Sequence, residues 1–287
     1  MSTRLKFFFI ALLISIPFWL GINVFQENLE NFFYQREITT SPYLLASIAY
    51  QAELEEKLEQ MKPVRNKHYD DLEIIAKSAI SVFVDEERRK EKILFEKNTD
   101  EKLPIASLTK LMTVYVALKN YNFSEEMKNS LYLTLIESNN EATLNLVQVM
   151  GEKTFVDLMN LEAQYLGLEN THFINPTGLD NKDSFNYSTV QDLAKFAKYL
   201  TAKNPSIWEI SIVPEFKNTS NTNRLLGEIS GIIGGKTGET PKSGGCLLLV
   251  VQTPKNKGYI VNVILNSENR FEEMKKLIDW TQYAYRW

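Results

Sequence analysis

The sequence predicts an α/β fold of the α+β kind, in which helices cover an antiparallel sheet. Two strand-like runs, 79–84 and 92–95, come first and are joined by a charged turn. Three more strand-like runs, 235–240, 245–252 and 259–266, follow a long central region in which apolar residues recur at helical spacing. Strands from both ends with helices between them imply a single sheet, closed by the two terminal segments and covered by a central helical lobe.

The helices are predicted from periodicity and from capping residues. Apolar positions favour central helices at 108–118, 127–136, 142–150 and 154–166. Gly167 fits the C-terminal cap of the last of these, and the segment from Ser188 to Ala194 is typical of a helix start with a capping side chain. A final helix is predicted from about Glu268 to Tyr285.

Residues 1–26 are predicted to form a short cytoplasmic start and a transmembrane anchor. No charged side chain occurs from Phe7 to Gln26, and twenty helical residues at about 1.5 Å each span roughly the 30 Å core of a bilayer. A cleaved signal peptide is the alternative, but no small-x-small site closely follows this run. Basic residues precede it and acidic residues follow it, which favours a single-pass protein of the cell membrane with its domain outside the cytoplasm.

Residues 27–70 are predicted to be a stalk or linker, and residues 71–287 a single domain. Apolar residues at helical spacing from Leu54 to Met61, ended by Pro63, favour a solvated spacer helix that is too short for a coiled coil. The apolar segment from Pro42 to Tyr50 is too short to span a membrane, although it can lie at a membrane surface.

Composition excludes several classes of function. The net charge is −4 and the lysines are scattered, so the chain offers no basic stripe for nucleic acid. Only two histidines, His68 and His172, are available, too few for a histidine-rich zinc site and poor material for a Ser-His-Asp triad. The single cysteine, Cys246, lies in an apolar run and is expected to be a buried core residue. We therefore expect neither a metal nor another cofactor.

Three short motifs follow one another in the chain: Ser107-Leu-Thr-Lys110, Ser138-Asn-Asn140 and Lys236-Thr-Gly238. Ser107 and Lys110 are three residues apart, so on a helix the amine can reach the hydroxyl and activate it as a nucleophile. A lysine acts as a base only when burial or a nearby positive charge lowers its pKa, and Lys236 can supply that charge. A serine in a first helical turn also lies close to backbone amides that can stabilise an oxyanion.

The other two motifs supply complementary groups. The Ser138 hydroxyl can relay a proton toward a leaving nitrogen, and the Asn140 amide can orient a lysine and a substrate carbonyl. The Lys236-Thr-Gly238 motif suits the lip of an exposed strand, where a peptide adds by main-chain hydrogen bonds and Gly238 permits close approach. Each motif alone also fits an ordinary helix cap or turn, and it is their combination that favours a serine nucleophile.

These residues resemble the low-molecular-mass penicillin-binding proteins, which are serine D-alanyl-D-alanine carboxypeptidases. The similarity extends from about Ala79 to Trp280 and includes Pro104 to Thr113 and Phe173 to Leu179. It implies a β-lactamase/transpeptidase-like fold. It also implies an enzyme that removes the terminal D-alanine of peptidoglycan stem peptides through an acyl-enzyme and that β-lactam antibiotics inhibit covalently.

The resemblance implies a role for each site residue. Ser107 attacks the bond between the two D-alanines, with Lys110 as the base. Ser138 and Lys236 form the proton and charge network, and Asn140 holds the substrate amide. Thr237 contacts the terminal carboxylate, while the backbone amides of Ser107 and Glu239 hold the oxyanion. Arg270 matches the family's carboxylate-binding arginine through its spacing to Leu277.

Departures from the family pattern leave alternatives open. The connection at 119–131 is shorter than usual in the family, so the lobe beside the cleft is predicted to be reduced. Endopeptidase activity on cross-links is kept as a variant of this function, and the reduced lobe keeps open a wall sensor that is acylated without turnover. A β-lactamase is a further alternative, although the segment 171–180, where such an enzyme has a water-activating glutamate, contains none.

Overall fold

The computed structural model describes residues 15, 21–22, 24–32, 34, 36, 41–182, 184–254 and 258–287. The chain divides into two compact units, Met1–Pro63 and Val64–Trp287. Most of the predicted anchor, Phe7 to Gln26, lies outside the described residues. Among those that are described, no helix has both the length and the apolar character needed to cross a bilayer.

The described part of the N-terminal unit is helical. Residues 24–32 form helical turns, and α2 (Pro42–Met61) is a continuous helix of twenty residues. This helix unites the apolar segment 42–50 with the spacer helix that periodicity predicts, and it ends two residues before Pro63. In its first half, large apolar side chains such as Tyr43 and Tyr50 are exposed.

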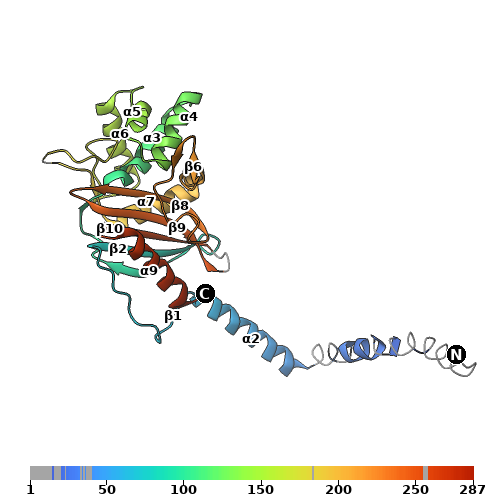
Figure 1. Cartoon of the computed structure of the whole chain (residues 1–287). Coiled ribbons are helices and arrows are strands. Elements are labelled where there is room, and N and C mark those ends of the chain that lie inside the picture. Colours follow the sequence, from blue (N-terminus) through green and yellow to red (C-terminus); the bar gives the residue numbers. More distant parts are fainter. Residues whose placement is uncertain are drawn as a thin grey trace, which may run out of the picture. The chain divides into compact units, whose positions relative to one another are not determined.

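The second unit is built on a five-stranded sheet with the order β3-β2-β10-β9-β8 (Figure 1). Its strands are β2 (Ser78–Asp85), β3 (Lys90–Lys97), β8 (Ile232–Thr240), β9 (Gly244–Gln252) and β10 (Tyr259–Ser267). All neighbouring strands are antiparallel. Because β2 pairs with β10, the first and last parts of the domain close one sheet, and the predicted fold class is confirmed.

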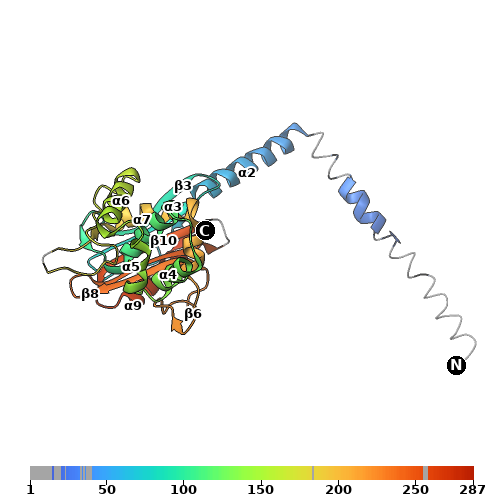
Figure 2. The same cartoon turned by 90° about the horizontal axis from the view of Figure 1, so that it is seen from above.

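Helices cover both faces of this sheet (Figures 1 and 2). The helices of this unit are the short 3₁₀ helix η1 (Ala106–Leu108), α3 (Thr109–Asn120), α4 (Glu125–Ile136), α5 (Asn140–Val147), α6 (Glu152–Tyr165), α7 (Val190–Lys203), α8 (Pro205–Ser211) and α9 (Arg270–Tyr283). Side chains alternate along a strand, so Leu248 and Val250 of β9 join the core under α3 and α7. Leu247 and Leu249 join the core under α9.

Capping residues define the ends of three of the helices. The Asn139 side chain accepts a hydrogen bond from the Ala142 amide and begins α5, and Thr189 begins α7 in the same way. At the end of α6, Gly167 adopts a φ of +66°, and the Leu168 amide donates to the Ala163 carbonyl, as in a Schellman motif. The C-terminal cap predicted at Gly167 is therefore confirmed.

The C-terminus departs from the prediction. The last helix, α9, ends at Tyr283, and Tyr285 lies instead in β11 (Tyr285–Arg286), which pairs with β1 (Val64–Arg65). Residues 64–65 of the predicted linker thus belong to the sheet-containing unit. Two further sheets have two short strands each. In one, β4 (Leu103–Pro104) pairs with β5 (Tyr187–Ser188), and in the other, β6 (Glu215–Phe216) pairs with β7 (Thr219–Ser220). Strands of two residues are too short to leave a periodic pattern in the sequence.

Candidate active site

The first two motifs meet at the Lys110 amine. Ser107 lies in η1 and Lys110 in the first turn of α3, where the Lys110 side chain is fully buried. Its Nζ lies 2.9 Å from Ser107 Oγ and 2.8 Å from Asn140 Oδ1. It also donates to the main-chain carbonyl of Thr177 at 2.7 Å. The structure therefore brings the predicted nucleophile, base and amide into direct contact.

Burial lowers the pKa of the Lys110 amine, and its hydrogen-bond partners suit the neutral form. Removal from water lowers the pKa of Lys110 to about 7, because an ammonium ion is poorly stabilised in the protein interior. A neutral amine has two N–H groups and one lone pair. Those groups match the surroundings, since the oxygens of Asn140 and Thr177 can each accept one hydrogen bond and the Ser107 hydroxyl can donate one.

A strained turn and a closely packed loop hold the nucleophile. Ala106, just before Ser107, has a φ of +46°, a conformation that residues other than glycine rarely adopt. Gly178, with a φ of +84°, packs so close that a Cβ atom on it would lie 2.0 Å from the Ala106 carbonyl oxygen. The Asn175 side chain accepts hydrogen bonds from the Thr177 and Gly178 amides and fixes this loop. Sequence reasoning assigned no role to Thr177 or Gly178, although Asn-Pro-Thr-Gly is typical of a turn.

Ser138 lies at the entrance of α5. Its φ is +64°, and its Oγ is buried without a hydrogen-bond partner among the described residues. A buried hydroxyl that makes no hydrogen bond costs free energy, and strained residues concentrate at functional sites. Ser138 thus has free hydrogen-bonding capacity close to Asn140, in accordance with the proton relay that the motif predicts.

The third motif lies on β8, the edge strand of the sheet. Lys236 is buried, and its Nζ donates to the Thr237 carbonyl at 3.1 Å. The pKa of Lys236 is lowered well below its ordinary value by burial first, and then by the charges of Lys110 and Arg270. A Cβ atom on Gly238 would lie 3.0 Å from the Ser107 amide nitrogen. Gly238 therefore lets β8 pack directly against the turn that carries the nucleophile.

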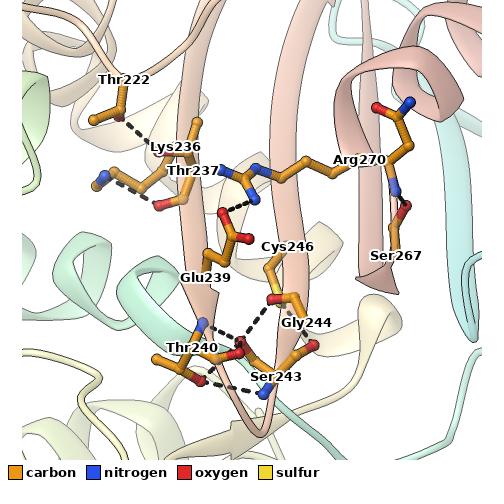
Figure 3. Close-up of polar contacts among 11 residues, drawn as sticks. Thr222, Lys236, Thr237, Glu239, Thr240, Ser243, Gly244, Cys246, Ser267 and Arg270 are labelled. Carbon is orange, nitrogen blue, oxygen red and sulfur yellow. Dashed lines mark hydrogen bonds and ion pairs between the residues drawn. The ribbon is translucent and has the colours of Figure 1, made fainter.

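Thr222 connects the second and third motifs. Its amide donates to the carbonyl of Ile136, two residues before Ser138. Its hydroxyl lies 2.6 Å from the Thr237 hydroxyl, a contact drawn in Figure 3. The segment around Thr222 is one that the sequence analysis did not include in the site, because it has no periodicity and its partner is fifteen residues away in the chain.

Arg270 reaches the third motif from α9, of which it is the first residue. Figure 3 shows its side chain extending toward β8, with the guanidinium group near Thr237 and Glu239. Its Nη1 donates to the Glu239 carboxylate, and its Nε is buried without a partner among the described residues. The structure thus places Arg270 beside Thr237, while the ion pair with the Glu239 side chain is a contact that the sequence did not reveal.

Residues set aside from the sequence lie in structural positions. Cys246 is completely buried, and burial raises the pKa of its thiol to about 11, which disfavours a thiolate. His172 forms an isolated β-bridge with Tyr187, and the two rings lie 5.9 Å apart. The prediction that Cys246 is a core residue therefore agrees with the structure, and His172 lies in a β-bridge.

Comparisons with known proteins agree with this geometry. The model of the peptidase family S11, D-alanyl-D-alanine carboxypeptidase, matches residues 64–130 and 119–269. The chain is 29% identical over 253 residues to D-alanyl-D-alanine carboxypeptidase DacF of Bacillus subtilis, with 73% of this chain and 63% of DacF aligned. It is 30% identical over 233 residues to a D-alanyl-D-alanine endopeptidase of Pseudomonas aeruginosa, with 67% of this chain and 73% of that protein aligned.

A solved structure supports the same relationship. Penicillin-binding protein D2 from Listeria monocytogenes, in its ampicillin-bound form, superimposes with a TM-score of 0.65 at 26% identity and covers 75% of this chain and 100% of that chain. The chain spans less than two thirds of the length of DacF. The matched region nevertheless includes all three motifs and most of the sheet, and the chain belongs to the S11 family of D-alanyl-D-alanine carboxypeptidases.

Proposed function

We propose that this protein is a membrane-anchored serine D-Ala-D-Ala carboxypeptidase. It removes the terminal D-alanine from peptidoglycan stem peptides through an acyl-enzyme on Ser107. The observation that carries the proposal is the 2.9 Å contact between Ser107 Oγ and the buried Lys110 amine. Family membership supports the choice of substrate, since the matching family is that of D-alanyl-D-alanine carboxypeptidases.

Acylation begins when Ser107 Oγ attacks the carbonyl carbon of the penultimate D-alanine. Neutral Lys110 takes the hydroxyl proton as the new C–O bond forms, while the oxygens of Asn140 and Thr177 keep its amine in place. The carbonyl electrons move to oxygen, and the backbone amides of Ser107 and Glu239 bind the resulting oxyanion. The close approach of Gly238 to the Ser107 amide supports this arrangement, because it brings β8 next to η1.

Collapse of the intermediate breaks the C–N bond and releases D-alanine. Its amine needs a proton, which Lys110 returns through the Ser138 hydroxyl, whose Oγ is free of other hydrogen bonds among the described residues. Thr237 and Arg270 hold the carboxylate of the departing residue. Water then attacks the ester on Ser107, with Lys110 again as the base, and releases the shortened peptide.

Endopeptidase activity on cross-links is a second candidate, because the Pseudomonas aeruginosa relative is named a D-alanyl-D-alanine endopeptidase. The chemistry at the D-alanine carbonyl is the same, and only the leaving group differs. A β-lactamase is less compatible with the site. The loop at 175–179 presents the Thr177 carbonyl to Lys110, and the nearby Asp180 carboxylate accepts a hydrogen bond from the Lys242 amide instead.

The nucleophile is tested by replacing Ser107 with alanine. We expect Ser107→Ala to abolish the penicillin adduct in intact-mass spectra and the release of D-alanine from a Lys-D-Ala-D-Ala peptide, because no acyl-enzyme can form. Ser206→Ala, an exposed serine on α8, is the matched control and should retain both. Circular dichroism checks that both variants are folded.

Three results would contradict the proposed function. Wild-type labelling of Ser107→Ala would remove Ser107 from the nucleophile's role. An adduct on the unmodified protein without D-alanine release would identify an acylated wall sensor that does not turn over. Rapid, sustained nitrocefin hydrolysis that is lost in Ser107→Ala would identify a β-lactamase, whereas we expect an adduct that persists for many minutes.

The pKa of Lys110 predicts the pH dependence of acylation. The amine is active in its neutral form, so the second-order rate of acylation by penicillin should rise about tenfold per pH unit below 7 and level off above it. Stopped-flow or quenched mass spectrometry from pH 5 to pH 9 measures this profile. Lys110→Arg keeps the positive charge and should be inactive throughout. A profile that is flat down to pH 5 would show that Lys110 is not the base.

Thr222 is expected to position Thr237 for substrate binding. Thr222→Val removes the hydroxyl 2.6 Å from that of Thr237 at nearly constant volume, so KM for the D-Ala-D-Ala peptide should rise about fivefold, with a smaller change in kcat. Thr222→Ser keeps the hydroxyl and should behave like the parent. Equal impairment of the serine and valine variants would point to packing rather than to the hydrogen bond.

Membrane anchoring is proposed from the uncharged run at Phe7 to Gln26. The full chain should stay with membranes after a carbonate wash, and its domain should be cleaved by protease added from outside. An otherwise identical chain that starts after residue 40 should be recovered in the supernatant. A shortened soluble form of the full chain would show that the run is a cleaved signal peptide.

A further inference from the structure

The Glu239 side chain makes an ion pair at the third motif that the mechanism does not use. Arg270 Nη1 donates to the Glu239 carboxylate (Figure 3). The two partners differ in their surroundings, since the exposed fraction of the side chain is 64% for Glu239 and 17% for Arg270. The carboxylate therefore lies at the surface, whereas the arginine is mostly enclosed by protein.

The stem of the Arg270 side chain packs closely against β9. It starts at the first residue of α9 and passes Gly245, where a Cβ atom would lie 3.2 Å from Arg270 Cβ and 3.3 Å from Cδ. Gly245 is the partner of Glu239 in the β8–β9 register, so the arginine stem crosses β9 at that point. Gly245 thus leaves the room that the stem needs, and the mostly enclosed guanidinium group pairs with a carboxylate that lies largely in solvent.

The Arg270 guanidinium group belongs to the electrostatic environment of the third motif. Arg270 is one of the groups whose charge lowers the pKa of the buried Lys236 amine. Thr237, whose hydroxyl bonds to Thr222, precedes Glu239 by two residues on the same strand. Among the residues that the structure describes, Glu239 is the carboxylate that forms an ion pair with Arg270. A ligand carboxylate that reaches Thr237 and Arg270 would therefore meet a cation that already has a partner.

We propose that the Glu239 carboxylate is a built-in competitor for the carboxylate of the ligand at Arg270. It makes the residue after the third motif a determinant of specificity, because binding a peptide that ends in a carboxylate requires Glu239 to leave the guanidinium group. A peptide with a neutral C-terminus does not require this exchange. The site is thereby less selective for a free carboxylate than an unpaired arginine would make it. This inference rests on the proposed binding of D-Ala-D-Ala peptides.

The size of the effect follows from the exposure of Glu239. Ion pairs with an exposed partner are weak, and displacing one changes an equilibrium constant by about two- to fivefold. We therefore expect Glu239→Gln, which keeps the size and removes the charge, to bind the acid peptide about two- to fivefold more tightly. The C-terminal amide of the same peptide should bind with unchanged affinity. The backbone amide of residue 239 is the same in both proteins.

Calorimetric titration measures these affinities without turnover when every protein also carries Ser107→Ala. The ligands are diacetyl-Lys-D-Ala-D-Ala and its C-terminal amide. Glu91→Gln is the matched control. Glu91 is a similarly exposed carboxylate, and it forms an ion pair with Lys198 at 2.5 Å. It lies on β3, the edge strand opposite β8. Glu239→Gln is also made together with Arg270→Gln, where it should have no effect, since the cation for which Glu239 competes is gone.

The outcomes separate this inference from the proposed function. The competition is supported if Glu239→Gln binds the acid peptide more tightly and the amide peptide with unchanged affinity. This gain should be absent when Arg270→Gln is also present, and absent in Glu91→Gln. Weaker binding of the acid in Glu239→Gln, or an equal change for the acid and the amide, overturns it. D-alanine release by the protein with an intact Ser107 tests the proposed function separately, so a failed carboxypeptidase and a failed competition give different results.

Discussion

The site depends on the burial of two lysine amines beside a serine hydroxyl. Lys110 on α3 and Lys236 on β8 are both buried side chains. A buried ammonium ion costs several kcal/mol unless a counter-charge accompanies it, and the hydrogen-bond partners of Lys110 are neutral oxygens. The fold therefore favours the neutral amine. A lysine that is neutral at neutral pH is a base, so the chemistry follows from where the packing places the side chain.

Such burial requires a rigid surrounding, and the fold provides it on every side of α3. Each residue from Thr109 to Ala117 is buried, and the helix belongs to the core that joins the sheet to the helical lobe. Well-packed cores resist small displacements, so they can hold backbone in sparsely populated conformations. Ala106 and Ser138, both with positive φ, flank this core at the two motifs. Gly178 and Gly238 leave the space that the turn at Ala106 needs.

Much of the sheet and of the site could be predicted because the relevant signals are local. The apolar run of β9 lies within a few residues, and so does the spacing of Ser107 and Lys110. The three motifs could therefore be recognised from short stretches of sequence. The short helix α8 and the two-residue strands were missed, because they carry too few residues for a periodic pattern. Their existence is decided by tertiary packing.

The site residues that were missed belong to segments distant in the chain. Thr222 touches Thr237 across fifteen residues, and the Thr177 carbonyl touches Lys110 across sixty-seven. A main-chain carbonyl leaves no trace in the side-chain pattern, so no residue type could have signalled Thr177. The Glu239 side chain was overlooked for a related reason, since its predicted role concerned only its backbone amide. Its partner, Arg270, comes from a different element, thirty-one residues later.

The three basic side chains of the site lie in environments of different polarity, and this determines how each can respond to a ligand. Lys110 and Lys236 are enclosed, so a change in their charge state is governed by proton transfer rather than by exchange of a counter-ion. Arg270 instead pairs with the Glu239 carboxylate through its guanidinium group. Its partner carboxylate is largely in water, where ion pairs are weak and exchange easily. The inner amines are therefore suited to moving protons, and the outer guanidinium group to exchanging one carboxylate for another.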